Sequence, residues 1–200
     1  MRIAPLPFPT APLKCVVGID IAKDSFVACG GYSTLSQQLH FGKETTFANT
    51  ESGFVALLSW AVKQHVSGSA LWFVVEATGV HYEELAYFLA NNQHLLSVLL
   101  PNKVKHFARS TELKSKTDQL DARLLCRLGL ERALPAWQPP TPALRQLRAL
   151  ARERQVLVRQ AAQLKIRTHA YQRSYQPDSR TLARLAAQQQ LVVSQLKALD

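Results

Sequence analysis

Five short apolar segments constrain the fold of this chain more than any other feature. Each has about the length and composition of one β-strand. They are residues 14–21, 25–31, 35–41, 70–76 and 95–100. The first three follow one another with short gaps, whereas longer stretches separate the others. The sequence therefore predicts a sheet that begins as a meander and continues through longer connections.

The longer stretches have apolar residues at helical spacing. The predicted helices are residues 50–64, 81–91, 102–110 and 117–130, with Thr50 or Asn49 as the N-cap of the first. Strands joined by short turns are expected to be antiparallel, and strands joined through a helix are expected to be parallel. The resulting order, βββ-α-β-α-β-α, is that of the RNase H-like fold. We therefore expect an α/β fold with a mixed sheet flanked by helices.

Prolines divide the chain. Residues 1–13 hold several of them and lack the apolar core of a signal peptide, so we interpret this segment as a loose leader. Residues 14–134 form the predicted α/β domain, and the sequence PAWQPPTP at 135–142 predicts a linker. Residues 143–200 are predicted to be helical, with a break at Pro177. The heptad pattern in the first helix is imperfect, because Arg154 interrupts it, which favours a hairpin or an irregular coiled coil.

The excess of positive over negative charge lies entirely in the second half of the chain. Residues 1–100 contain 5 Lys and Arg against 7 Asp and Glu, whereas residues 101–200 contain 19 against 7. This asymmetry indicates a polyanionic partner, because phosphates neutralised by Lys and Arg release counterions.

The three cysteines show no CxxC spacing, which favours a reduced cytoplasm without a zinc site. No apolar run is long enough for a membrane span.

Four carboxylates occupy positions at which they could bind a metal ion. Asp20 and Glu76 each end a predicted buried strand, and an ionised carboxylate there is costly unless it is paired or binds a cation. Asp118 and Asp121 share one face of a predicted helix. If the four converge, they suit a pair of divalent cations in phosphodiester chemistry. Taken singly, Asp118 also fits a helix N-cap and Asp20 a turn.

Basic residues precede the pair of aspartates, and we interpret them as phosphate contacts beside the site. They are Lys103, Lys105, Arg109, Lys114 and Lys116. A solvated loop is the alternative interpretation.

Four ordered motifs resemble one known family. They are GIDIAK at residues 18–23, EATG at 76–79, VKHFA at 104–108 and KTDQLDA at 116–122. Together they resemble the DEDD transposases of bacterial insertion sequences, whose relatives include Piv-type DNA invertases. The similarity extends over roughly residues 14–175.

The resemblance implies a RuvC-like domain whose acidic tetrad binds Mg²⁺, with Mn²⁺ as a substitute. By motif position the tetrad is Asp20, Glu76, Asp118 and Asp121. The resemblance also implies DNA as the substrate, a structured guide RNA, and association of protomers through the helical segment. A further domain with a serine nucleophile follows in the family, and we expect these 200 residues to lack it.

Two alternative functions fit the same sequence. A stand-alone junction or RNA nuclease would share the acidic site and cut nucleic acid without a further domain. The other is a non-catalytic fragment that binds nucleic acid and dimerises. An actin-like nucleotide-binding module is disfavoured, because no glycine-rich phosphate turn follows Asp20.

Overall fold

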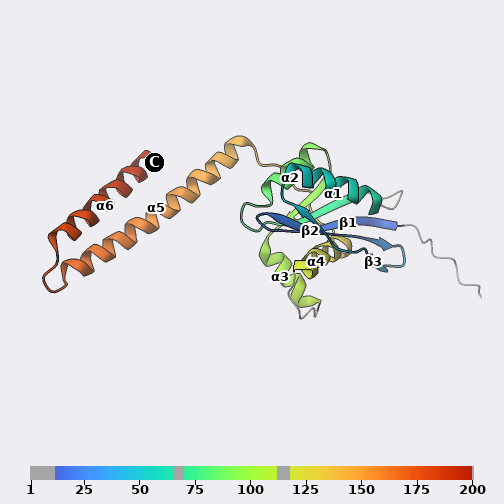
Figure 1. The fold of residues 1–200 in the computed structure, drawn as a ribbon, viewed down its shortest axis with the longest axis horizontal. Helices are drawn as coiled ribbons and strands as arrows, with labels where there is room; N and C mark the ends of the chain where they lie inside the picture. Colours follow the sequence, from blue (N-terminus) through green and yellow to red (C-terminus); the bar gives the residue numbers. More distant parts are fainter. Residues whose placement is uncertain (1–11, 65–69, 112–117, 200) are drawn as a thin grey trace, which may run out of the picture. The chain divides into compact units, whose positions relative to one another are not determined.

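The computed structural model describes residues 12–64, 70–111 and 118–199 (Figure 1). The chain divides into two compact units, Met1–Pro139 and Pro140–Asp200. The first unit contains β1 (Pro12–Ile21), β2 (Ser25–Thr34), β3 (Leu39–Phe41), β4 (Thr45–Ala48), α1 (Glu51–Gln64), β5 (Leu71–Glu76), α2 (Glu83–Asn91), β6 (Leu95–Leu99), α3 (Pro101–Ser110) and α4 (Asp118–Glu131). The second contains α5 (Pro142–Gln172) and α6 (Ser179–Leu199).

The strands form one mixed sheet in the order β3-β2-β1-β5-β6, and β4 also pairs with β2. Strands β1 to β4 pair antiparallel, whereas β1, β5 and β6 run parallel to one another. This arrangement confirms the predicted α/β fold, an RNase H-like mixed sheet flanked by helices and followed by a helical segment. Because β1, β5 and β6 are parallel, their carboxyl ends meet at one edge of the sheet.

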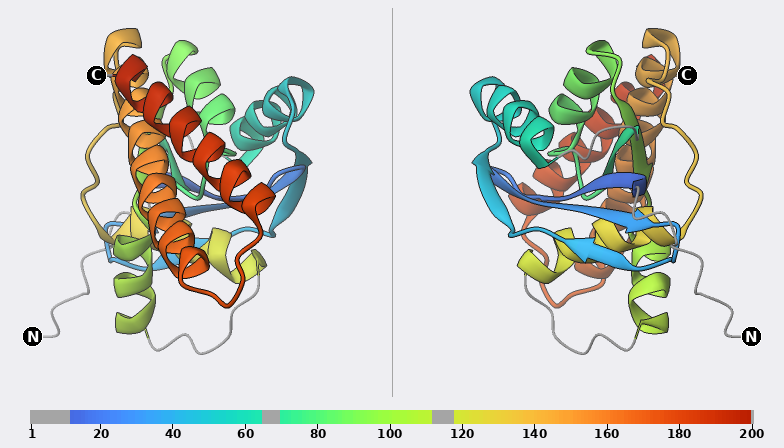
Figure 2. Two further views of the ribbon diagram at one scale, coloured as in Figure 1. Left: turned by 90° about the vertical axis from the view of Figure 1, so that its left-hand side faces the viewer. Right: turned by 90° about the vertical axis from the view of Figure 1, so that its right-hand side faces the viewer.

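Helices cover both faces of the sheet (Figures 1 and 2). Helices α1 and α2 pack on one face, where Ile19, Phe26 and Phe73 are almost fully buried. Helices α3 and α4 pack on the other face, over Val16 and Val74. Side chains of a strand alternate between faces, so each central strand contributes to both cores.

The meander differs from its prediction. Residues 35–38 form a turn, in which the Gln37 amide donates to the Thr34 carbonyl at 2.9 Å, so the third strand starts only at Leu39. The strand β4 was missed. Strand β2 continues to Thr34, three residues beyond its predicted end at Gly31. A Cβ on Gly31 would approach the Cys126 sulfur to 2.9 Å, so the glycine is needed for close packing of α4.

The proline-rich segment that we predicted as a linker is shared between the two units. The Ser97 hydroxyl donates to the Pro135 carbonyl at 2.7 Å, and the Trp137 amide donates to the Leu96 carbonyl at 2.7 Å. The Trp137 ring meets Tyr87 edge to face at 5.4 Å between centroids. Residues 135–137 are therefore held against β6 and α2.

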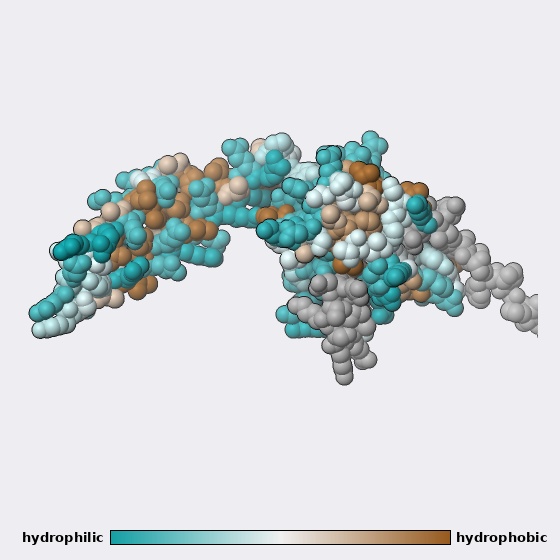
Figure 3. All heavy atoms as spheres, viewed as in Figure 1, coloured by the Kyte–Doolittle hydropathy of each residue, from teal (hydrophilic) through white to brown (hydrophobic). Residues whose placement is uncertain are grey.

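In the second unit, α5 and α6 lie side by side as a helical hairpin (Figures 1 and 2). Leu157 of α5 and Leu185 and Val192 of α6 are buried. Hydrophobic atoms gather between the two helices on the face shown in Figure 3. Asp178 is the N-cap of α6, and its carboxylate accepts hydrogen bonds from the amides of Arg180 and Thr181. No helix among the described residues has both the length and the apolarity that crossing a membrane requires.

Candidate metal and nucleic-acid site

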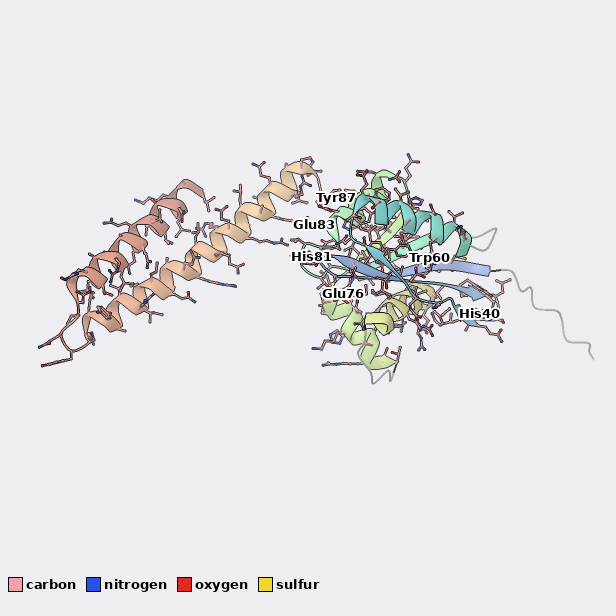
Figure 4. All side chains as sticks on the ribbon, in the orientation of Figure 1. His40, Trp60, Glu76, His81, Glu83 and Tyr87 are labelled. Carbon is pink, nitrogen blue, oxygen red and sulfur yellow. The ribbon has the colours of Figure 1, made fainter. Side chains whose placement is uncertain are left out.

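Two of the predicted acids stand at the carboxyl ends of neighbouring parallel strands. Ile19 of β1 pairs with Val75 of β5, so Asp20 and Glu76 occupy the next position of the same register. Both residues are partly exposed. Glu76 lies at one end of the sheet together with His81, and His40 lies at the opposite end (Figure 4). The strand geometry therefore gives the two carboxylates a common edge.

Both acids also belong to the sheet face that α4 covers. Side chains two positions apart along a strand point to the same face. Val74, two residues before Glu76, is buried in the core beneath α4. Gly18, two residues before Asp20, is so close to α4 that an added Cβ would meet the Ala122 carbonyl oxygen at 2.2 Å.

Helix α4 runs antiparallel to β1. Near the start of β1, the Lys14 ammonium donates hydrogen bonds to the carbonyl of Gly129, in the last turn of α4, and to that of Arg132, just after the helix. Further along β1, Gly18 lies against Ala122 in the first half of the helix. The first turn of α4 therefore points toward the carboxyl end of β1.

The other two predicted acids belong to that first turn. Asp118 is the first residue of α4, and Asp121 lies next to Ala122, which is fully buried. The backbone thus brings the start of α4 to the sheet edge that carries Asp20. The side chain of Asp118 lies outside the described residues. Among the described side chains, no three His, Cys, Asp or Glu residues gather closely enough to hold a metal ion.

The chain leaves β5 through a tight turn. The Thr78 hydroxyl donates to the Glu76 carboxylate at 3.1 Å, and the Thr78 amide donates to the Glu76 carbonyl at 2.9 Å. Gly79 has a φ of +61°, a conformation that glycine adopts without strain. This segment therefore turns the chain, and its hydroxyl fixes the orientation of the Glu76 carboxylate.

Asn49 joins the two segments that follow the strand-end acids. Its side-chain amide nitrogen donates to the carbonyls of Ala22 and Lys23, after β1, and of His81, after β5, at 3.0, 3.3 and 3.2 Å. The sequence predicted Asn49 or Thr50 as the cap of α1, and it is Thr50 that performs this role by accepting a hydrogen bond from the Gly53 amide. No local pattern could reveal the Asn49 contacts, because they cross between three separate segments.

Helix α3 carries three basic residues and begins at the same edge of the sheet. It starts two residues after β6, and its Val104 and Phe107 side chains are buried. The predicted phosphate ligands Lys103, Lys105 and Arg109 are exposed. The helix contains no acidic residue. Lys114 and Lys116, predicted for the same role, lie outside the described residues.

One nearby cation and two thiols have structural roles. Arg123 of α4 pairs with Glu44 at 2.7 Å, which links the helix to the connection between β3 and β4. Cys29 of β2 and Cys126 of α4 are buried and hydrogen-bonded to each other. That hydrogen bond, with burial, raises the pKa of the Cys126 thiol. Cys126 therefore stays protonated and serves in packing.

Comparisons with known proteins identify the family of the chain. A family model described as a transposase, of the DEDD type, matches residues 17–177. The pilin gene-inverting proteins of Moraxella lacunata and Moraxella bovis are each 34% identical to the chain over 169 residues. That region is 83% of this chain and 51% of each relative, so the chain spans about half the length of these relatives.

Among solved structures, the yeast mitochondrial Holliday junction resolvase is similar over 59% of this chain and 79% of its own. The identity is 14% and the TM-score is 0.41.

Proposed function

Because the chain belongs to the DEDD transposase family, we propose that it is the N-terminal catalytic part of a DNA transposase or recombinase that uses a divalent metal in strand cleavage and exchange. The observation that carries the proposal is the antiparallel course of α4 along β1, with Gly18 against Ala122. This course directs the first turn of α4 to the edge where β1 and β5 end.

The proposed metal ligands are Asp20, Glu76, Asp118 and Asp121. Carboxylate oxygens are the hard donors that Mg²⁺ and Mn²⁺ prefer, and the set contains neither imidazole nor thiolate, so the donor chemistry fits. When bound, such ions stabilise the attacking and leaving oxygens of a phosphodiester. The protein's own contribution is to position the acids. The β1–β5 register sets Asp20 beside Glu76, and the Thr78 hydroxyl orients the Glu76 carboxylate.

The proposed substrate is DNA, held beside the metal by Lys103, Lys105 and Arg109 of α3. Their exposed side chains share a helix with no carboxylate, so phosphate oxygens have no internal competitor on α3. Lys114 and Lys116 complete the proposed set of phosphate ligands. The family resemblance adds a structured guide RNA as a further partner of the same machinery.

We also propose that copies of the chain associate through the hairpin. Every residue of α5 from 142 to 156 is exposed, and Leu147 and Leu150 continue the stripe that contains Leu157. These leucines are 62% and 40% exposed, which leaves an apolar stripe that a second copy can cover.

The test of the metal site is a calorimetric Mn²⁺ titration of the chain and of its Asp20→Asn and Asp121→Asn variants. Asp24→Asn is the matched control, because Asp24 is an exposed carboxylate in the turn after β1. Binding by the wild type that is lost in both site variants and kept in the control supports the proposal. Circular dichroism verifies that each variant is folded. Undiminished binding by Asp20→Asn would refute the assignment.

A further inference from the structure

The outer face of α5 carries a stripe of arginines. Helix α5 contains 7 Lys and Arg and a single acidic residue, Glu153. At about 100° per residue, four of the arginines fall within about 60° of one another around the helix axis. They are Arg145, Arg148, Arg152 and Arg159, which we call the arginine stripe. Glu153 lies about a third of a turn away from its centre.

The stripe lies opposite the side of α5 that packs on α6. The residues of α5 that are buried or partly buried are Leu157, Ala161, Leu164, Thr168 and Tyr171. They mark the side that meets α6, where the Gln189 side chain donates to Thr168 at 3.1 Å. The helical period puts the centre of the stripe about half a turn from these residues. All four stripe arginines are exposed, so α6 leaves the stripe open.

Three arginines of the stripe make no ion pair with another described residue. Across the described residues, no ion pair engages Arg148, Arg152 or Arg159. A merely solvated helix face normally mixes basic and acidic residues. This face instead has arginines without a carboxylate, and the arginine guanidinium binds phosphate with two parallel hydrogen bonds.

We infer that the arginine stripe binds the phosphate backbone of double-stranded DNA. From the first to the last arginine, the stripe is about 21 Å long at 1.5 Å per residue. This length equals about six base pairs of duplex, whose strands each carry one phosphate per 3.4 Å of helix axis. The inference rests on the proposed function for the choice of DNA. It adds a second contact, in the helical unit, that needs no metal and reads no base.

The experiment measures binding of the full chain to a fluorescent duplex of about 24 base pairs, in EDTA, across a range of salt concentrations. The stripe variant is Arg148→Gln/Arg152→Gln/Arg159→Gln. The matched control removes the same charge from α6, as Arg180→Gln/Arg184→Gln/Lys197→Gln, at three exposed positions. A conservative variant replaces the three stripe arginines by lysine.

Each lost phosphate contact lowers the slope of log affinity against log salt by about 0.9, so the stripe variant should lose about 2.7 of slope. Its affinity near 0.1 M salt should fall at least about tenfold. The lysine variant should keep the slope, since it keeps the charge. An equal loss in stripe and α6 variants would overturn the inference, as would a wild-type slope in the stripe variant. The same titration with an RNA duplex of equal length is a further test. If the stripe variant loses affinity for the RNA duplex and not for the DNA duplex, the inference is also overturned.

The Asp20→Asn variant separates this inference from the proposed function. It should keep the full salt slope in EDTA while losing Mn²⁺ binding. If Mn²⁺ fails to bind the wild type but the slope depends on the stripe, the metal site is wrong and the stripe stands. If Mn²⁺ binds the wild type but the stripe variant keeps the wild-type salt slope, the metal site stands and the inference about the stripe is wrong.

Discussion

Gly18 of β1 lies against the backbone of Cys126 in α4, so closely that a Cβ at position 18 would be 2.1 Å from the Cys126 amide nitrogen. Backbone atoms on both sides leave no flexible group that could move away. Close packing of a helix on a strand thus depends here on the absence of a side chain. The position of α4, and of the acids in its first turn, depends on this glycine.

Gly18→Ala should therefore lower the free energy of unfolding by about 3 kcal/mol and displace α4. Urea denaturation measures the loss of unfolding free energy. Mn²⁺ titration of the variant tests whether the displaced helix weakens metal binding. Gly129→Ala is the matched control. There a Cβ would meet side-chain methyl groups, Val16 Cγ1 at 2.7 Å and Val74 Cγ2 at 2.8 Å, which can shift. Its cost should stay below about 1.5 kcal/mol, because alanine also favours the helix. Equal costs would contradict the proposed role of Gly18.

Asn49→Ala should weaken Mn²⁺ binding as well as stability. The substitution removes the three hydrogen bonds between the turn after β1 and the turn after β5, which hold the segments next to Asp20 and Glu76. We expect a loss of about 1–2 kcal/mol in unfolding free energy. Asn49→Gln tests whether the position of the amide matters, because glutamine carries the same amide one methylene further from the backbone. Wild-type Mn²⁺ affinity in a destabilised Asn49→Ala protein would mean that the residue serves the fold alone.

His94 should make the protein less stable as the pH falls. Burial beside the Phe73 ring, at 5.6 Å between centroids, lowers the pKa of His94 below its ordinary value of 6.5. The unfolded chain then takes up a proton near pH 6.5, whereas the folded chain does so only at lower pH. The unfolding free energy therefore decreases from about pH 7 downward until the lowered pKa is passed. His94→Gln should remove this contribution in urea titrations at several pH values. A variant with the unchanged pH profile would show that another group is responsible.

Leu147→Asp should weaken self-association at least about tenfold, because it puts a charge into the apolar stripe of α5 that the proposed second copy covers. Sedimentation equilibrium over a concentration range gives the dissociation constant. Val156→Asp is the matched control, since Val156 is 51% exposed on a different side of α5. A monomeric wild type at all concentrations would exclude association through this hairpin.

Local patterns predicted most of the fold. The apolar runs of β1, β5 and β6 and the helical spacing of α1 to α6 needed no information about distant residues. Where prediction was wrong, a distant contact decided the structure. Strand β2 extends three residues beyond its predicted end at Gly31, because it pairs there with β1 and β3. The short strand β4 depends on pairing with β2, and its Phe47 packs on Phe26 at 5.4 Å.

Of the candidate site, local sequence patterns located only the two acids at the strand ends. Asp20 and Glu76 were identifiable because a carboxylate closes each apolar run. The course of α4 depends on contacts of Gly18 and Lys14 with residues more than a hundred positions later in the chain. No periodicity encodes these contacts. The tetrad as a metal site and the phosphate contacts of α3 stay predictions.

The antiparallel course of α4 has a consequence for the order of synthesis. Asp20 leaves the ribosome early, but the helix that carries Asp118 and Asp121 follows only after all six strands. The same helix buries Val16 and Val74, so an unfinished chain has neither a closed core on that face nor a full set of acids. The addition of α4 therefore completes the core and the proposed acidic set together, and a nascent fragment that ends before α4 lacks two of the four proposed metal ligands.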